Sequence, residues 1–308
     1  MIIIGADGGG TKTAVQAFEV TPQGGWTAFA QAAAGPMNYN FISVEQAAQN
    51  LLEAISQLAL GDRKIAAIGI ADPSLDDCIP SDEQSLTAQF ARIVQKQLGV
   101  PVFMRSDAYI TLFGLTGGKE PAVLQLAGTG AMTIAQNGDG EVKVAGGWGR
   151  LTGDEGSGYF IASEAIKAAL HAADGIGEQT ALLDAAMTFF GVQTPRELIG
   201  VFYGDPEPDI AGFAHAAAVC AGQGDAAAQK ILCEAAEYLA AYTARLIEWS
   251  GSTKVGVYGS VICQNQTVRQ KYEEILKSRF ENVKIMEPPV SAMEAAAQYA
   301  FREYREAE

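Results

Sequence analysis

Short apolar runs alternate along this chain with longer segments whose apolar residues follow helical spacing. The run Ile2-Ile3-Ile4 predicts a buried strand, and residues 14–20 and 26–30 predict two further strands. A turn is expected at Pro22-Gln23-Gly24-Gly25, between the second strand and the third. The chain is therefore expected to begin with a three-stranded meander.

Helices and strands alternate after this meander. The first half is expected to add helices at residues 44–60 and 85–98 and strands at residues 65–71 and 102–104. For the second half we expect helices at 157–172, 180–190, 210–221, 226–249, 268–280 and 291–304, and strands at 254–258 and 283–286. Such alternation is typical of sheets that contain parallel strands, so the predicted fold class is α/β.

A strand that ends in glycines occurs twice. Residues 2–7 lead into Gly8-Gly9-Gly10, residues 121–127 lead into Gly128-Thr129-Gly130, and each glycine turn is followed by a strand, a turn and another strand. An internal repeat of this kind predicts two related domains that face each other across a cleft. We expect the chain to cross from one domain to the other at residues 115–120.

The first glycine turn has the composition of a phosphate-binding loop. Glycines let backbone N–H groups approach a phosphate without a Cβ in the way, and Thr11 and Lys12 add a hydroxyl and a cation. A strand rather than a helix follows, so neither a Rossmann fingerprint nor a Walker loop fits. The prediction is a β-hairpin phosphate clamp, and the alternative is a plain glycine-rich turn.

Composition restricts the possible functions. The chain has 308 residues, 48% of them hydrophobic, which suits two domains with cores of their own. Its net charge of −15 argues against a nucleic-acid partner. The four cysteines lie far apart, a spacing that indicates reduced, buried thiols rather than a zinc site or disulfides. With no signal peptide and no membrane-spanning stretch in the sequence, we expect a cytoplasmic protein without a membrane partner.

Several motifs, spread over nearly the whole length, resemble one superfamily. They are Asp7-Gly8-Gly9-Gly10-Thr11-Lys12-Thr13, Ser106-Asp107-Ala108, Ala127-Gly128-Thr129-Gly130, the segment 146–159 (GGWGRLTGDEGSGY) and Val257-Tyr258-Gly259-Ser260-Val261-Ile262. The pattern resembles the sugar kinase, Hsp70 and actin superfamily, and within it the N-acetylglucosamine kinase and BadF/BadG/BcrA/BcrD group. The resemblance implies two ribonuclease H-like (actin-like ATPase) domains with a cleft between them, with ATP and Mg²⁺ as cofactors.

The resemblance also implies that the last helix returns to the first domain. We therefore expect an N-terminal actin-like ATPase domain of residues 1–115 plus 288–308 and a C-terminal one of residues 116–287. A homodimer is a further implication.

Two carboxylates are candidates for the chemistry of phosphoryl transfer. Asp107 follows a predicted strand, where α/β sheets present ligands, and the family has its catalytic carboxylate at this position. The alternative is that Asp107 caps the helix that starts at Ala108. Asp7 lies beside the first glycine turn and would hold Mg²⁺ through water, unless it only caps that turn.

Further site residues are expected from the loops and from the resemblance. The residues expected to bind ATP are Gly8, Gly9, Gly10, Thr11, Lys12, Gly128, Thr129, Gly130, Ala211, Gly259 and Ser260. The residues expected to bind the sugar are Asn38, Asp107, Gly147, Trp148, Gly149 and Asp154. Three positions have a second interpretation: Lys12 as a solvated hairpin residue, Trp148 as a core residue, and Glu155 as a residue that holds its loop.

Two positions depart from the family pattern. Ala131 stands where relatives commonly have a serine after Gly-Thr-Gly, which removes one hydroxyl contact to phosphate. Asp72 stands where relatives tend to have a glycine-rich turn near the 2-substituent of the sugar. It either pairs with a free amine, which would favour glucosamine over N-acetylglucosamine, or starts a surface turn before Pro73.

The function predicted from these features is an ATP-dependent kinase of an amino sugar, of the N-acetylglucosamine or glucosamine type. The acceptor is expected to be a hydroxyl group, the primary 6-hydroxyl, with Asp107 as general base. A second hypothesis is a BadF-type ATPase that activates a redox partner, although no cysteine occupies a matching glycine-flanked position. A third is a protein without catalysis, either a sugar sensor or an actin-like assembly protein.

Overall fold

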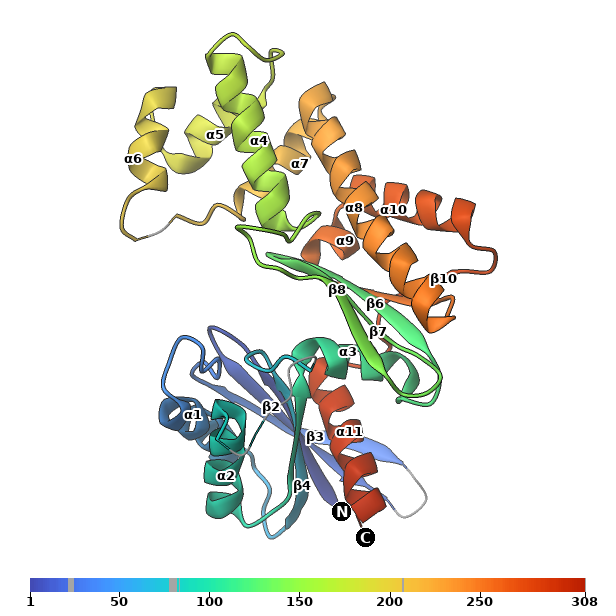
Figure 1. Cartoon of the computed structure of the whole chain (residues 1–308). Helices are drawn as coiled ribbons and strands as arrows, with labels where there is room; N and C mark the ends of the chain where they lie inside the picture. Colours follow the sequence, from blue (N-terminus) through green and yellow to red (C-terminus); the bar gives the residue numbers. More distant parts are fainter. Residues whose placement is uncertain (22–24, 78–81, 83, 207, 308) are drawn as a thin grey trace. The chain divides into compact units, whose positions relative to one another are not determined.

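The computed structural model describes residues 1–21, 25–77, 82, 84–206 and 208–307 (Figure 1). The turn predicted at Pro22–Gly25 lies outside the described residues except for Gly25, and Cys78 lies outside them as well. The chain folds into two compact units. Unit 1 comprises Met1–Pro121, Gly138–Val142 and Pro288–Glu308, and unit 2 comprises Ala122–Asn137 and Lys143–Glu287. The domain limits expected from the sequence, residues 1–115 plus 288–308 and residues 116–287, stay a proposal.

Unit 1 is built on one five-stranded sheet. Its strands are β1 (Ile2–Gly8), β2 (Thr13–Val20), β3 (Trp26–Ala34), β4 (Ile65–Asp72) and β5 (Val102–Ser106), in the order β3-β2-β1-β4-β5. Its helices are α1 (Val44–Ser56), α2 (Leu86–Leu98), α3 (Asp107–Thr116) and α11 (Ala292–Ala307). The meander β1-β2-β3 is antiparallel, whereas β1, β4 and β5 run parallel to one another. The carboxyl ends of β1, β4 and β5 therefore lie at the same edge.

Side chains of β1 alternate between the two faces of this sheet. Ile2, Ile4 and Ala6 pack into the core that contains the buried residues of α1 and α2. Ile3 belongs to the core on the other face, where α11 packs on β1 and β4 (Figure 1). Helix α11 approaches so closely that a Cβ at Gly5 would overlap the carbonyl of Met293. The C-terminal helix is thus part of the core of unit 1.

Unit 2 repeats this topology. Strands β6 (Ala122–Ala127), β7 (Ala131–Gln136), β8 (Val142–Gly146), β9 (Lys254–Tyr258) and β10 (Lys284–Met286) lie in the order β10-β9-β6-β7-β8. Its helices are α4 (Gly158–Ala173), α5 (Leu182–Phe190), α6 (Leu198–Phe202), α7 (Phe213–Gly222), α8 (Ala226–Ser250), α9 (Ser260–Gln264) and α10 (Gln266–Arg279), with a 3₁₀ turn at Pro195–Glu197. Since β6 takes the central place that β1 has in unit 1, the repeat seen in the sequence is a repeat of the fold.

The described helices include none that is both long and apolar enough to cross a membrane.

Candidate active site

Carboxylates collect at the edge of unit 1 where the three parallel strands end. In the strand register Asp7 pairs with Ala71, and Asp72 pairs with Ser106, which directly precedes Asp107. This edge is where open α/β sheets present their ligand-binding residues. Two residues predicted from the sequence, Asp7 and Asp107, therefore belong to the same edge, and the charge of Asp107 acts on the ionisation of Asp7.

Asp107 is the first residue of α3 and is open to solvent. The cap of the helix is Ser106, whose hydroxyl accepts the Tyr109 N–H, so helix capping does not require Asp107. The Asp107 carboxylate accepts the Ala108 N–H at 2.7 Å. Partial removal from water, followed by the nearby Asp77, raises the pKa of Asp107, although its open side leaves this effect partly screened. A raised pKa makes an exposed carboxylate a better proton acceptor.

Asp7 lies half-buried at the end of β1. Burial, followed by repulsion from Asp107, raises its pKa to about 6, while Lys12 acts in the opposite direction. A carboxylate that is destabilised by another carboxylate suits a hard divalent cation, because Mg²⁺ is held by one or two carboxylates together with phosphate oxygens and water. The chemistry of a carboxylate at this edge fits Mg²⁺, and both roles expected for Asp7, metal ligand through water and turn cap, stay predictions.

The first glycine loop is tied to the segment that carries Asn38. The Met37 N–H donates to the Gly9 carbonyl at 3.0 Å, and the Thr13 hydroxyl donates to the Gly35 carbonyl at 2.8 Å. Gly10, Thr11 and Lys12 are exposed, and a Cβ added at Gly10 would meet no atom within 4 Å. Open space of this kind at the tip of the loop is what the approach of a phosphate needs.

Asp72 starts a turn, since its carbonyl accepts the Leu75 N–H, but its side chain is 0% exposed and so does not lie at the surface. Its carboxylate oxygens are used within the protein. One accepts a hydrogen bond from the Tyr39 hydroxyl, and the other accepts the Ser74 N–H at 2.8 Å. Ser74 in turn bonds Tyr39 N–H and the Asn38 side chain. Through these bonds Asp72 supports the segment that carries Asn38, and its pairing with a free amine stays a prediction.

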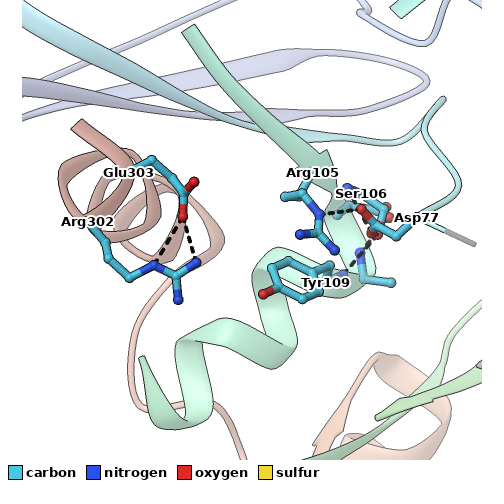
Figure 2. A network of polar contacts seen from close by, with 8 residues as sticks. Asp77, Arg105, Ser106, Tyr109, Arg302 and Glu303 are labelled. Atoms are coloured by element: carbon cyan, nitrogen blue, oxygen red, sulfur yellow. Dashed lines mark hydrogen bonds and ion pairs between the residues drawn. The ribbon is translucent and has the colours of Figure 1, made fainter. Parts of the chain in front are cut away.

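Sequence reasoning missed a second polar network on the same edge. Arg105 donates to Asp77 at 2.5 Å, and the same carboxylate accepts both the hydroxyl and the N–H of Ser106 (Figure 2). Residues in a turn and a strand, 28 positions apart, offer no local signal for this pairing.

In unit 2 the second glycine loop lies against the start of α4. The N–H groups of Gly158 and Tyr159 donate to the carbonyls of Gly128 and Thr129, at 2.7 and 3.2 Å. Thr129 and Gly130 are exposed. They line a cavity of about 260 Å³ together with the following residues: Arg150, Asp154, Tyr159, Pro208, Asp209, Ile210 and Ala211. The structure thus brings together three residues predicted to bind ATP, Thr129, Gly130 and Ala211.

Gly259 joins the same part of unit 2. Its φ of 107° lies where only glycine is comfortable, and a Cβ there would lie 3.0 Å from the Gly128 nitrogen. Ser260, which starts α9, is exposed. The residues predicted for the adenosine side therefore lie next to the second glycine loop.

The loop after β8 carries the remaining predicted sugar ligands. Trp148 is 77% exposed, so its interpretation as a core residue is wrong. Asp154 has a φ of 57°, and its carboxylate accepts the N–H groups of Gly149, at 3.2 Å, and of Ala131. Burial, then Glu155, raises the pKa of Asp154. A Cβ at Gly130 would lie 2.9 Å from Asp154 Oδ2, so Asp154 lies beside the second glycine loop.

Glu155 holds its loop, which is the role that the sequence suggested for it. It accepts the Tyr242 hydroxyl of α8 at 2.8 Å, and burial together with this contact raises the pKa of Tyr242 to about 12. Gly147 and Gly149 have φ values of 73° and 83°, which give this loop its tight path. Trp148 is thereby presented outward between two glycines.

Three of the four cysteines lie in the part of the chain that the structure describes. Cys220, Cys233 and Cys263 are free thiols; of these three Cys220 alone is buried, so the expectation of buried thiols is wrong for the other two. Within the described residues no group of three or more histidine, cysteine, aspartate or glutamate side chains is arranged to hold a metal ion.

Comparisons with known protein families and relatives agree on one family of ATPases and on kinases of amino sugars. The model of the BadF/BadG/BcrA/BcrD ATPase family matches residues 4–297. An N-acetylmuramic acid/N-acetylglucosamine kinase of Clostridium acetobutylicum is 28% identical over 296 residues, which are 92% of this chain and 93% of the relative. An N-acetyl-D-glucosamine kinase of Dictyostelium discoideum is 28% identical over 216 residues, 67% of this chain and 65% of the relative.

Solved structures share the fold. A candidate N-acetylglucosamine kinase of Chromobacterium violaceum matches with a TM-score of 0.73 and 24% identity, over 97% of this chain and 98% of that one. A ROK family glucokinase of Streptomyces griseus, solved with glucose and AMPPNP, matches with a TM-score of 0.60 and 16% identity, over 98% and 100%. The expected two-domain actin-like architecture is therefore confirmed at the level of the fold.

Proposed function

The chain belongs to the BadF/BadG/BcrA/BcrD ATPase family, and on that premise we propose that it is an ATP-dependent kinase of an amino sugar. Relatives named as kinases of N-acetylmuramic acid and N-acetylglucosamine support the substrate class. The proposed acceptor is the primary 6-hydroxyl of an N-acetylglucosamine-type sugar. The observation that carries the proposal is Asp107, an exposed carboxylate of raised pKa at the carboxyl end of β5.

In the proposed reaction Asp107 accepts the proton of the sugar hydroxyl as its oxygen attacks the γ-phosphorus of ATP. The bond between that phosphorus and the β,γ-bridging oxygen breaks, ADP leaves, and the sugar phosphate is formed. Asn38 and the loop with Gly147, Trp148, Gly149 and Asp154 are the proposed sugar ligands. Trp148 has the exposed ring that a sugar platform requires.

The proposed nucleotide ligands come from both units. Gly8, Gly9, Gly10, Thr11 and Lys12 would bind phosphate from unit 1. Gly128, Thr129, Gly130, Ala211, Gly259 and Ser260 would bind the nucleotide from unit 2, and the cavity that Thr129, Gly130 and Ala211 line supports this assignment. Asp7 would hold Mg²⁺ through water, and the bound ion would neutralise the charge of the transferred phosphate.

A coupled ADP-release assay tests this function. The purified chain is given ATP with N-acetylglucosamine, glucosamine, N-acetylmannosamine, N-acetylmuramic acid or glucose, with and without Mg²⁺. We expect Mg²⁺-dependent ADP release with an N-acetylated hexosamine and little with glucose or without sugar. Release of ADP at the same rate without any sugar would favour an ATPase that serves another partner. The homodimer implied by the resemblance remains a prediction, which light scattering tests.

A further inference from the structure

We propose that the ion pair between Arg105 and Asp77 is a positioning pair that fixes the Asp107 carboxylate for proton transfer. The inference rests on the proposed function, in which Asp107 is the general base. Neither Arg105 nor Asp77 is expected to touch the sugar or ATP. They act through the junction of β5 and α3, where Ser106 ends the strand and Asp107 starts the helix.

The first step is the set of hydrogen bonds that Asp77 accepts from the end of β5. One carboxylate oxygen accepts the Arg105 Nε–H at 2.5 Å, and the other accepts the Ser106 N–H at 3.2 Å and the Ser106 hydroxyl. The Asp77 side chain is only 3% exposed. Both oxygens are therefore committed to the two residues that directly precede Asp107 in the chain.

The second step leads from Ser106 to the base itself. The Ser106 hydroxyl, which donates to Asp77, accepts the Tyr109 N–H at 3.0 Å and so caps α3. Asp107 accepts the Ala108 N–H at 2.7 Å. Since the N–H groups of Ala108 and Tyr109 are adjacent in the first turn, a shift of the cap would move the carboxylate with it.

The third step is the support of Arg105 from its other side. Its guanidinium carbon lies 3.6 Å from the centre of the Tyr109 ring (Figure 2). Arg105 also interacts with the Tyr299 side chain of α11. The rings of Tyr109 and Tyr299 pack edge to face, with centroids 6.0 Å apart. Arg105 thus contacts Asp77, Tyr109 of α3 and Tyr299 of the C-terminal helix at once.

Charge explains why a pair is needed here rather than a lone carboxylate. Asp77 raises the pKa of Asp107, and the charge of Asp107 in turn raises the pKa values of Asp7 and Asp72. The buried Asp77 carboxylate adds one more negative charge at this edge, and without a neighbouring cation its burial would destabilise the folded state. Arg105 supplies that cation, because its Nε–H donates to Asp77 while its planar guanidinium lies over the Tyr109 ring.

Two variants and a matched control test the inference by kinetics. Arg105→Ala and Asp77→Asn should lower kcat by about 10- to 100-fold, because a small misplacement of a catalytic group has effects of this size. The KM values for ATP and for the sugar should stay within about twofold, because the pair touches neither. Arg269→Ala is the control. Its ion pair with Glu273 in unit 2 has the same 2.5 Å separation, and the Arg269 side chain is 23% exposed, close to 27% for Arg105.

Rescue by a small cation separates positioning from general stability. The Arg105 side chain is 27% exposed, so ethylguanidinium can reach the space left in Arg105→Ala. We expect it to restore at least part of kcat, whereas sodium chloride at equal ionic strength does not. Lowered kcat with raised KM, a lowered melting temperature and no rescue would assign the pair a merely structural role and overturn the inference.

A second readout needs no substrate. Amide hydrogen exchange of Ala108 and Tyr109 in the full chain should become about tenfold faster in Arg105→Ala and Asp77→Asn, and unchanged in Arg269→Ala, as expected for local opening of a helix end. Unchanged exchange in all three variants would contradict the inference. If no amino sugar supports ADP release, the proposed function fails, and the exchange result still decides whether the pair positions Asp107.

Discussion

The hydroxyl of Ser74 donates a hydrogen bond of 3.2 Å to the side-chain oxygen of Asn38. The same Asn38 oxygen accepts the Asn40 N–H at 3.0 Å. Because a backbone N–H can only donate, these bonds fix the orientation of the Asn38 amide. Its oxygen is occupied, so Asn38 would meet a sugar through its amide nitrogen, as a hydrogen-bond donor.

Ser74→Ala should weaken sugar binding. The substitution removes the bond to Asn38 and the bond that Ser74 accepts from the Tyr39 N–H at 3.0 Å. We expect KM for the sugar to rise about 5- to 10-fold, in line with a loss of about 1 kcal/mol for an oriented hydrogen bond, with KM for ATP unchanged. Steady-state kinetics with each substrate varied in turn measure this. An equal rise of both KM values would contradict the assignment of Asn38 to the sugar.

Asp72→Asn should stabilise the protein at neutral pH. Burial, which outweighs the hydrogen bonds from Tyr39 and Ser74, raises the pKa of Asp72 to about 6, from an ordinary value of 3.8. The folded state therefore holds the proton more tightly than the unfolded state. The stability that the protonated Asp72 contributes is fully present below the ordinary pKa of 3.8, and it is lost as the pH rises through 6. At pH 7.5 the neutral variant should be more stable by up to about 3 kcal/mol.

Urea unfolding of both proteins between pH 4 and 7.5 measures this difference. The gap between Asp72→Asn and the natural chain should shrink toward zero near pH 4. Ser85→Ala, which removes the half-buried cap of α2, is a control whose effect should not depend on pH. A gap that is the same at every pH would show that Asp72 is not ionised at a cost to folding.

Asp7 should make the Mg²⁺ requirement depend on pH. Burial and repulsion by Asp107 raise its pKa to about 6, so a proton competes with the cation below that pH. The Mg²⁺ concentration for half-maximal activity should rise about tenfold for each pH unit below 6. Asp7→Asn should need more Mg²⁺ at pH 7.5 and lose this dependence. Equal Mg²⁺ titrations of the two proteins would remove Asp7 from the proposed metal site.

The two glycine loops can be tested by adding one methyl group to each. A Cβ at Gly10 or at Gly128 would meet no atom of the protein within 4 Å, so Gly10→Ala and Gly128→Ala should fold normally. If phosphate approaches the backbone there, each should raise KM for ATP by about tenfold or more, as expected for a methyl group in the way of a close contact. Gly222→Ala is the control, because Gly222 lies in α7 with the same open surroundings. Normal KM values for ATP would contradict the phosphate-binding role.

The sequence predicted most strands and helices within a few residues, because their apolar periodicity is strong. The helix expected at residues 44–60 ends at Ser56, and the strand expected at 102–104 continues to Ser106. The short helices α6 and α9 were missed, because five residues carry too little periodicity to be recognised. The repeat of the two sheets was recognised, because each meander contains glycines at the same place.

The site was predictable where chemistry is local and not where it depends on tertiary contacts. Asp107 follows a strand and Gly128–Gly130 form a turn, so both could be found from neighbouring residues. Asp72 could not be understood in this way, because its role depends on Tyr39, 33 positions earlier in the chain. The same holds for Asp154, whose carboxylate folds back onto Gly149 and Ala131 in a left-handed backbone conformation.

The proton-transfer role of Asp107 is the centre of this account. In Asp107→Asn the amide keeps the size of the side chain but cannot accept a proton, so ATP binding should persist while the chemical step is lost. The most direct measurement is single-turnover transfer of the labelled γ-phosphate to the preferred amino sugar, with enzyme in excess over ATP. We predict a rate at least about 100-fold below that of the natural chain, with unchanged ATP affinity by calorimetry. Transfer at the natural rate in Asp107→Asn would contradict the account.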